Sequence, residues 1–142
     1  VIKAWFFGLG NLFAYRQFQD KNLVIDRHFA SNYFWNGTKE SNIVFKTMLD
    51  IIGAPDLTIL LYASVETRMK RLYKRNPNDW DCFDPEKKVD GYDKMIAFLE
   101  EFNISYVLVD TENKTIDEVI DIVNAIVVEK QAENKILKLE RK

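Results

Sequence analysis

The sequence lacks several features that would point to particular classes of protein. Its single cysteine, Cys82, excludes an internal disulfide framework and favours a reducing compartment, which we take to be the cytoplasm. No apolar run approaches the roughly 18 residues of a membrane span, and no signal peptide is visible, so we expect no membrane partner. The formal net charge is only -2. Without a basic excess, nothing indicates a nucleic acid polymer as partner.

What the sequence does contain is typical of one globular α/β domain. Hydrophobic residues make up 47% and charged residues 30% of the 142 residues, with no repeats or low-complexity linkers, so we expect a single domain over 1–142. Buried parallel strands are predicted at 23–26, 58–62 and 106–110, with the last two adjacent. Helices are predicted over 1–20, 38–54, from Ser64, over 84–103, and after Thr115. This alternation predicts a three-layer α/β/α fold with a parallel sheet.

Apolar spacing predicts a buried face on the first two predicted helices, and Gly53 would end the second. The residues of these faces are Ile2, Phe6, Leu9, Leu12 and Phe13 in the first helix, and Ile43, Val44, Thr47, Met48 and Ile51 in the second.

An acid and an arginine close the first predicted strand. Ligands of open α/β sheets bind in the crevice outside the carboxyl ends of the strands, which is where Asp26 and Arg27 would lie. Asp26 could hold a metal ion or orient a hydroxyl, and the planar fork of Arg27 suits a phosphate. The alternative is an ion pair at a strand end with no catalytic role.

The residues around this pair resemble the signature of thymidylate kinases. The matching stretch is Asp26-Arg27-His28, then Ser31, then Trp35-Asn36-Gly37. The family has Asp-Arg followed by an aromatic residue or His, then Ser and Tyr-Gln-Gly at the same spacing, so Trp35 and Asn36 replace Tyr and Gln. Deoxynucleoside kinases carry a similar acid-Arg-x-x-x-Ser.

The resemblance implies roles for these residues. Asp26 would bind Mg²⁺ or polarise the acceptor, Arg27 would bind the acceptor phosphate, and Ser31, Trp35 and Asn36 would contact the substrate. Phe13-Ala14-Tyr15-Arg16 is similar to the family's Phe-Ala-x-x-Arg helix, which implies a base contact for Arg16, although the motif is one residue short and lies closer to Asp26 than usual.

A predicted helix and polar loop follow the second strand. Arg71 and Arg75 lie on one side of the helix that Ser64 begins, and the breaker-rich segment 76–83 comes next. An ordinary solvated basic face is one interpretation. By the family resemblance, residues 71–84 form a lid, in which both arginines would stabilise the charge of the transferring phosphoryl group.

The third predicted strand also ends in an acid. By resemblance, the loop that begins with Asp110 and Thr111 would lie beside the adenine of ATP. The alternative is helix capping, because Thr115 and Glu118 have the spacing of a capping box.

A phosphate-binding loop is missing from these residues. The five glycines never form Gly-x-x-x-x-Gly-Lys-Ser/Thr, so the resemblance covers the later two-thirds of the family's domain. Gly8-x-Gly10 would fit a Rossmann-type dinucleotide fingerprint, but its third position is Phe13, where close packing needs Gly or Ala.

The resemblance therefore implies a phosphotransferase of the P-loop nucleoside/nucleotide kinase type. In its complete form it would move the ATP γ-phosphoryl group, with Mg²⁺, to a nucleoside monophosphate such as dTMP or to a deoxynucleoside, and this chain alone would be inactive. A second copy of the chain is a candidate partner. A non-catalytic relic that binds nucleotide or a partner chain, or a dinucleotide binder, are the alternatives.

Overall fold

The computed structural model describes residues 1–84 and 90–140, of which 134–140 are described by their backbone alone. Contacts divide the chain into two compact units. The helical unit consists of Val1–Asp56 and Gly91–Ser105, and the sheet unit consists of Leu57–Asp90 and Tyr106–Lys142. Each unit is built from two separate stretches of chain. The single domain expected over 1–142 stays a prediction.

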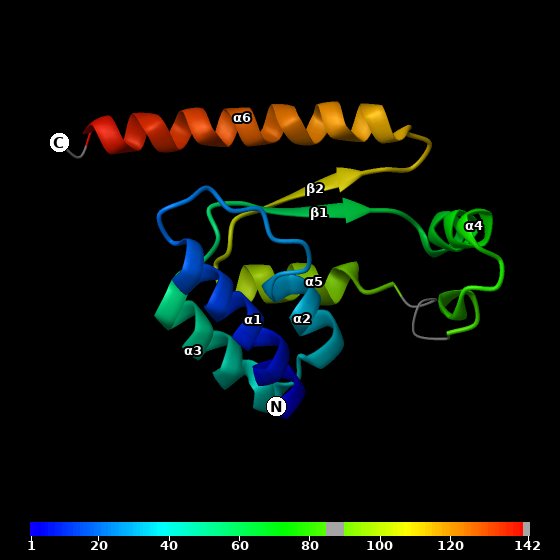
Figure 1. The fold of residues 1–142 in the computed structure, drawn as a ribbon, viewed down its shortest axis with the longest axis horizontal. Coiled ribbons are helices and arrows are strands. Elements are labelled where there is room, and N and C mark those ends of the chain that lie inside the picture. The colour runs from blue at the N-terminus through cyan, green and yellow to red at the C-terminus, as the bar shows by residue number, and fades with distance from the viewer. Residues whose placement is uncertain (85–89, 141–142) are drawn as a thin grey trace. The chain divides into compact units, whose positions relative to one another are not determined.

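Helices alone make up the regular structure of the helical unit. Its elements are α1 (Ile2–Phe18), α2 (Phe29–Asn36), the short 3₁₀ helix η1 (Lys39–Ser41), α3 (Asn42–Ile52) and α5 (Tyr92–Glu101). Helix α1 packs on both α2 and α3, and α2 also packs on α5 (Figure 1). The first stretch of the unit thus contacts the second through α2 and α5.

Aromatic rings fill the core of the helical unit. The Phe98 ring stacks on Tyr33 with centroids 4.4 Å apart, and it meets Phe45 edge-on at 5.3 Å. Phe29, Phe45 and Phe98 are each at most 1% exposed. Offset and edge-on pairs of this kind add to the free energy that their large buried area contributes.

The predicted helix over 1–20 is confirmed by α1, but the face that it buries is not the predicted one. Its buried residues are Ala4, Gly8 and Asn11. The apolar side chains on which the prediction rested are exposed, by 85% at Ile2, 70% at Phe6, 57% at Leu9 and 68% at Phe13. The small residues face inward because they let α1 approach its neighbours closely.

Gly8 shows why the small residues face inward. A Cβ added at Gly8 would collide with the thioether of Met48 on α3, so glycine lets the two helices approach closely without moving that side chain. Both Gly8 and Gly10 lie inside a continuous helix. The dinucleotide fingerprint needs them in a turn between a strand and a helix, and that alternative is therefore wrong.

The strand predicted at 23–26 is wrong. These residues form no strand, and Val24 is 97% exposed. In the described part of the chain the sheet has two strands, which pair with each other. A strand is stable only when a neighbour completes its backbone hydrogen bonds, and 23–26 has none.

The helix end predicted at Gly53 is confirmed, and the structure adds a cap at Thr38 that was not predicted. Thr38 and Ser41 form a reciprocal capping box at the start of η1, and Gly53 ends α3 with a φ of 76°. Val44 and Met48 are buried as predicted, whereas Ile43 and Ile51 are 63% and 54% exposed. Helix α5 is observed at Tyr92–Glu101. The start predicted at Asp84-Pro85 reaches into residues 85–89, which lie outside the described residues.

The sheet unit contains the two strands predicted at 58–62 and 106–110. Strands β1 (Thr58–Tyr62) and β2 (Tyr106–Asp110) are adjacent and parallel, with Thr58 opposite Tyr106 and Tyr62 opposite Asp110. Helix α4 (Val65–Arg75) and the 3₁₀ helix η2 (Trp80–Cys82) follow β1. Helix α6 (Ile116–Glu140) follows β2 and runs beside it (Figure 1).

The chain is thus a mixed α/β protein with a small parallel sheet, as an incomplete P-loop-kinase-like fold would be. Among its described residues, the sheet unit buries few apolar side chains, which are Leu60, Ala63, Cys82 and Val109. Across the described ranges, none of the helices combines the length and apolar character that crossing a bilayer requires.

Candidate functional site

Asp26 and Arg27 lie in the loop between α1 and α2, and both are exposed. Arg27 has a φ of 62°, in the left-handed region. A side chain with a Cβ adopts this conformation at a cost of about 1–2 kcal/mol. Among the residues that the structure describes, Asp26 and Arg27 form no ion pair with each other. The simple strand-end pair is therefore absent, and both charged groups face solvent.

His28 follows as the N-cap residue of α2. Its ring lies 4.0 Å from that of Phe29, and burial lowers the pKa of His28 from 6.5 to about 4. The imidazole is therefore neutral near pH 7.

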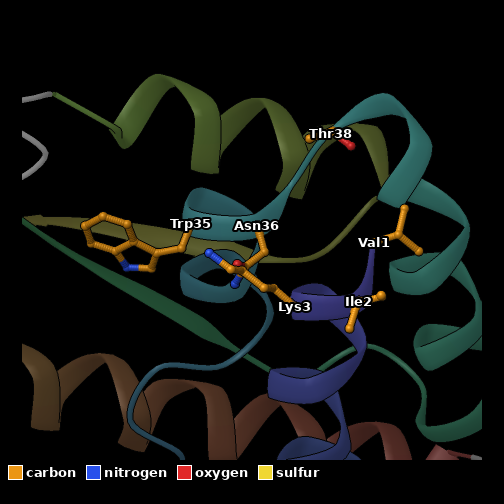
Figure 2. A pocket seen from close by; sticks show the side chains of 6 residues that line it. All are labelled: Val1, Ile2, Lys3, Trp35, Asn36 and Thr38. Carbon is orange, nitrogen blue, oxygen red and sulfur yellow. The ribbon is translucent and has the colours of Figure 1, made fainter.

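The end of α2 borders a pocket of about 420 Å³ in the helical unit. Its lining residues are Val1, Ile2, Lys3, Trp35, Asn36 and Thr38 (Figure 2). The structure thus brings the predicted substrate residues Trp35 and Asn36 to one pocket, and it adds Lys3, which the sequence gave no signal to select. An indole face, an amide and an ammonium group could respectively stack on a base, read its edge and attract a phosphate.

Two other predicted substrate residues lie outside this pocket. Ser31 is half-buried on α2, one turn before Trp35, and does not line the cavity. Arg16 is exposed in the last turn of α1. Thirteen residues of helix separate it from Lys3, which corresponds to about 20 Å at 1.5 Å per residue. Arg16 therefore cannot reach a small ligand held beside Lys3.

In the sheet unit, the carboxyl ends of β1 and β2 lie together, as parallel pairing requires. The Thr111 hydroxyl donates to the Tyr62 carbonyl at 2.7 Å. The Arg71 guanidinium donates to the Thr111 hydroxyl at 2.9 Å and to the Thr111 carbonyl at 2.6 Å. A predicted lid arginine and a predicted ATP-loop residue are thus in direct contact.

Glu112 was not selected by sequence reasoning. Its carboxylate accepts hydrogen bonds from the Ser64 backbone N–H and, at 2.5 Å, from the Thr67 hydroxyl. The Thr67 and Ser64 bonds, with a smaller contribution from Arg71, lower the pKa of Glu112 to about 2. The usable signal was the parallel pairing itself, which brings an acid in the loop after β2 next to the unpaired N–H groups at the start of α4.

The neighbouring acid has a local role. The Asp110 carboxylate accepts from the Glu112 backbone N–H at 2.8 Å, which is an Asx-type turn. Thr115 and Glu118 form the predicted capping box, with Glu118 Oε2 2.7 Å from Thr115 N and Thr115 Oγ1 3.2 Å from Glu118 N. Capping thus accounts for Thr115, as the alternative interpretation held.

Arg75 pairs within the predicted lid. Its guanidinium lies 2.5 Å from the Asp79 carboxylate, which also accepts from the Asp81 backbone N–H at 3.1 Å at the start of η2. The Arg75 side chain is 63% exposed. Trp80 is 77% exposed, while Cys82 is fully buried and anchors the segment. The assignment of 71–84 as a lid stays a prediction.

Asp26 is also the predicted metal ligand. No cluster of three or more His, Cys, Asp or Glu side chains suited to a metal occurs in residues 1–84 and 90–140. Mg²⁺ in kinases is usually held by one or two carboxylates together with substrate phosphates and water, so it needs no such cluster. The exposed Asp26 carboxylate fits this kind of site.

Comparison with protein families gives a match over most of the chain. A family model described as Thymidylate kinase matches residues 13–123. The matched range includes Asp26 and Arg27, both lid arginines and Glu112, and it excludes Lys3. Searches of curated proteins and of solved structures found no match.

Proposed function

The chain belongs to the thymidylate kinase family, and on that premise we propose that it transfers the ATP γ-phosphoryl group to a nucleoside monophosphate of the dTMP type, or to a deoxynucleoside. Membership of this family supports phosphotransfer of the nucleotide-kinase type as the general function. The acceptor, the ATP and Mg²⁺ requirement and the site residues are our proposal.

The observation that carries the proposal is the conformation of Arg27. An arginine held exposed at a φ of 62° beside a free carboxylate costs free energy that the fold itself does not need. Strained, charged and accessible residues of this kind are typical of functional sites. The pair occurs inside the matched range, and by its sequence it resembles the family's Asp-Arg.

Each candidate residue then has a chemical task. Arg27 binds the acceptor phosphate through its planar fork, and Asp26 holds Mg²⁺ or orients the acceptor. The bound Mg²⁺ would neutralise charge on the ATP phosphates. Arg71 and Arg75 stabilise negative charge on the transferring group.

The remaining residues bind the two nucleotides. Trp35 and Asn36, with Lys3 beside them, hold the acceptor, and Ser31 supports that helix. Asp110 and Thr111 form the edge against which the adenine lies. Arg16 contacts the acceptor base only if the acceptor lies away from the Lys3 pocket.

A phosphate-binding loop has to be supplied for turnover, because the 142 residues contain no such motif. We expect no turnover from these residues alone and phosphotransfer from the complete gene product. A complete product that binds nucleotide without turnover would instead favour the non-catalytic relic. A cytoplasmic location stays a prediction from the cysteine content.

The test of Arg27 is its replacement by lysine in the complete protein. Lysine keeps the charge but loses the bidentate fork, so kcat/KM should fall about tenfold or more, at about 1.4 kcal/mol per decade, with Tm little changed. Lys46→Arg on the exposed side of α3 is the matched control. Unchanged kcat/KM in Arg27→Lys would refute the phosphate role.

We also propose a second copy of the chain as partner. The face of α1 formed by Ile2, Phe6, Leu9 and Phe13 is more than half exposed at every position, which is unusual for large apolar side chains in a row. Phe6→Glu should convert a dimer to a monomer in sedimentation experiments, whereas Lys46→Glu should not. A wild-type monomer at all concentrations would contradict this partner.

A further inference from the structure

We propose that Glu112 is a positioning residue that couples the loop after β2 to helix α4, so that the nucleotide at this loop and the arginines of α4 move together. This inference rests on the proposed function, because it assigns the loop to ATP. It adds a residue that neither the sequence motifs nor the family match selects.

The geometry of the carboxylate supports the coupling. Glu112 uses both of its oxygens, Oε1 for the Ser64 backbone N–H and Oε2 for the Thr67 hydroxyl. Ser64 is the N-cap of α4 and Thr67 lies in its first turn. The first N–H groups of a helix have no partner within it, and an acid there is further favoured by the helix dipole. Glu112 therefore binds the one end of α4 that offers donors to it.

A second set of contacts crosses the same boundary one turn further along α4. Thr67 and Arg71 are four residues apart and share a helix face. Arg71 donates twice to Thr111, which precedes Glu112, and the Thr111 hydroxyl donates in turn to Tyr62 at the end of β1. Residues 111 and 112 are thus fixed to α4 at two points and to β1 at one.

These contacts constrain where Arg71 can act. Its guanidinium is held against Thr111 and is attracted by the Glu112 carboxylate, which its charge helps to keep ionised. Without Glu112 the start of α4 is free to move away from the loop, and Arg71 and Arg75 move with it. The loop that receives the adenine and the helix that carries the arginines would then lose their fixed relation.

A Glu112 that only stabilises the fold would make the same contacts, so the test must separate this stabilising role from the positioning role. In the complete protein, Glu112→Gln keeps the size of the side chain but loses one charged acceptor. We expect KM for ATP and Kd for ADP to rise about tenfold, while KM for the acceptor stays within about twofold, since a charged hydrogen bond corresponds to roughly that factor or more.

Glu118→Gln is the matched control. Glu118 is a carboxylate in the first turn of α6, where it accepts two bonds from Thr115, and in the described residues it has no hydrogen bond to α4. It should leave both nucleotide constants unchanged, and Glu112→Asp should recover part of the loss. Equal effects of Glu112→Gln on ATP and acceptor, or equal effects of the two glutamine variants, would overturn the proposal.

Hydrogen exchange keeps the inference testable if the kinase assignment fails. A wild-type protein without ADP binding or turnover would refute the proposed function alone. Glu112→Gln should still raise exchange both in 110–115 and in the first turn of α4. Faster exchange in the loop with an unchanged α4 would refute the coupling.

Discussion

The helical unit and the sheet unit are stabilised in opposite ways. In the helical unit, stacked and edge-on rings around Phe98 bury large apolar area, and the helices approach closely at Gly8. In the sheet unit the buried apolar side chains are few, and long-range side-chain hydrogen bonds around Thr111 and Glu112 connect the elements. A close-packed apolar core resists small displacements, whereas hydrogen bonds near the surface can be exchanged for bonds to water or to a ligand.

The difference suggests a division of tasks between the units. On the proposed function, the helical unit would carry the residues proposed to bind the acceptor, and the sheet unit would supply polar contacts that rearrange when nucleotide binds. Changes in the core of the first should therefore cost stability, and changes in the second should mainly alter binding. The predictions below begin with the largest expected effect.

Phe98→Ala should give the largest loss. Removing a ring that is 1% exposed leaves a cavity next to Tyr33 and Phe45, and the free energy of unfolding should fall by about 3–5 kcal/mol. Phe83→Ala is the control in the sheet unit, where the side chain is 59% exposed and the loss should be below about 1 kcal/mol. Urea denaturation followed by circular dichroism measures both. Similar losses in the two variants would remove the contrast between the units.

Acid should act on the helical unit first. The pKa of His28 is about 4 in the folded protein and 6.5 in the unfolded chain. As pH drops from 6.5 to 4 the unfolded chain therefore binds the proton first, and the free energy of unfolding falls. The full shift corresponds to roughly 3 kcal/mol. His28→Gln should remove this part of the pH dependence.

The sheet unit should respond at lower pH. The pKa of Glu112 is lowered from 4.5 to about 2, so its contribution is complete above 4.5 and is lost as pH falls from 4.5 towards 2. Glu112→Gln should remove this window and leave the higher one. Unfolding free energies of wild type and both variants at pH 7, 4.5 and 3 separate the two windows. A single shared window would contradict the assignment.

Thr115→Ala should cost about 1 kcal/mol, because the cap of α6 loses its side-chain acceptor for the Glu118 N–H. Thr38→Ala removes the equivalent cap in the helical unit and is the matched comparison. Thermal unfolding of both variants measures the difference. No change in either would mean that tertiary packing alone fixes these helix ends.

Arg27→Gly should have the smallest effect on stability, and in the opposite direction. Glycine relieves the left-handed strain but makes the unfolded chain more flexible, so stability should stay level or rise by up to about 1 kcal/mol. Binding of the acceptor phosphate should nevertheless be lost. A marked loss of stability would show that Arg27 is structural.

Local signals in the sequence predicted much of the fold. The cap at Thr115 involves residues three apart and the stop at Gly53 a single backbone angle, so the sequence contains the whole interaction. The two apolar runs predicted strands β1 and β2, which the structure pairs in parallel. The N-cap role of Ser64 is confirmed for the same reason.

Interactions over long distances along the chain were not predictable in this way. A strand at 23–26 depends on a partner that an apolar run does not reveal. The inward face of α1 was decided by the fit of Gly8 against Met48, not by hydrophobicity. Glu112 bonds to Thr67, 45 residues away, and only the paired strands show that they meet. The candidate pair Asp26 and Arg27 could be selected from the sequence because the two residues are adjacent in it.

The exposed ring of Trp80 gives the segment between α4 and α5 a built-in optical reporter. At 77% exposure the indole emits in a largely aqueous environment and is open to collisional quenchers. The other two tryptophans, Trp5 and Trp35, belong to the helical unit, so replacing both with phenylalanine would leave emission from the sheet unit alone. Movement of this segment against a bound nucleotide could then be followed in real time without an attached dye.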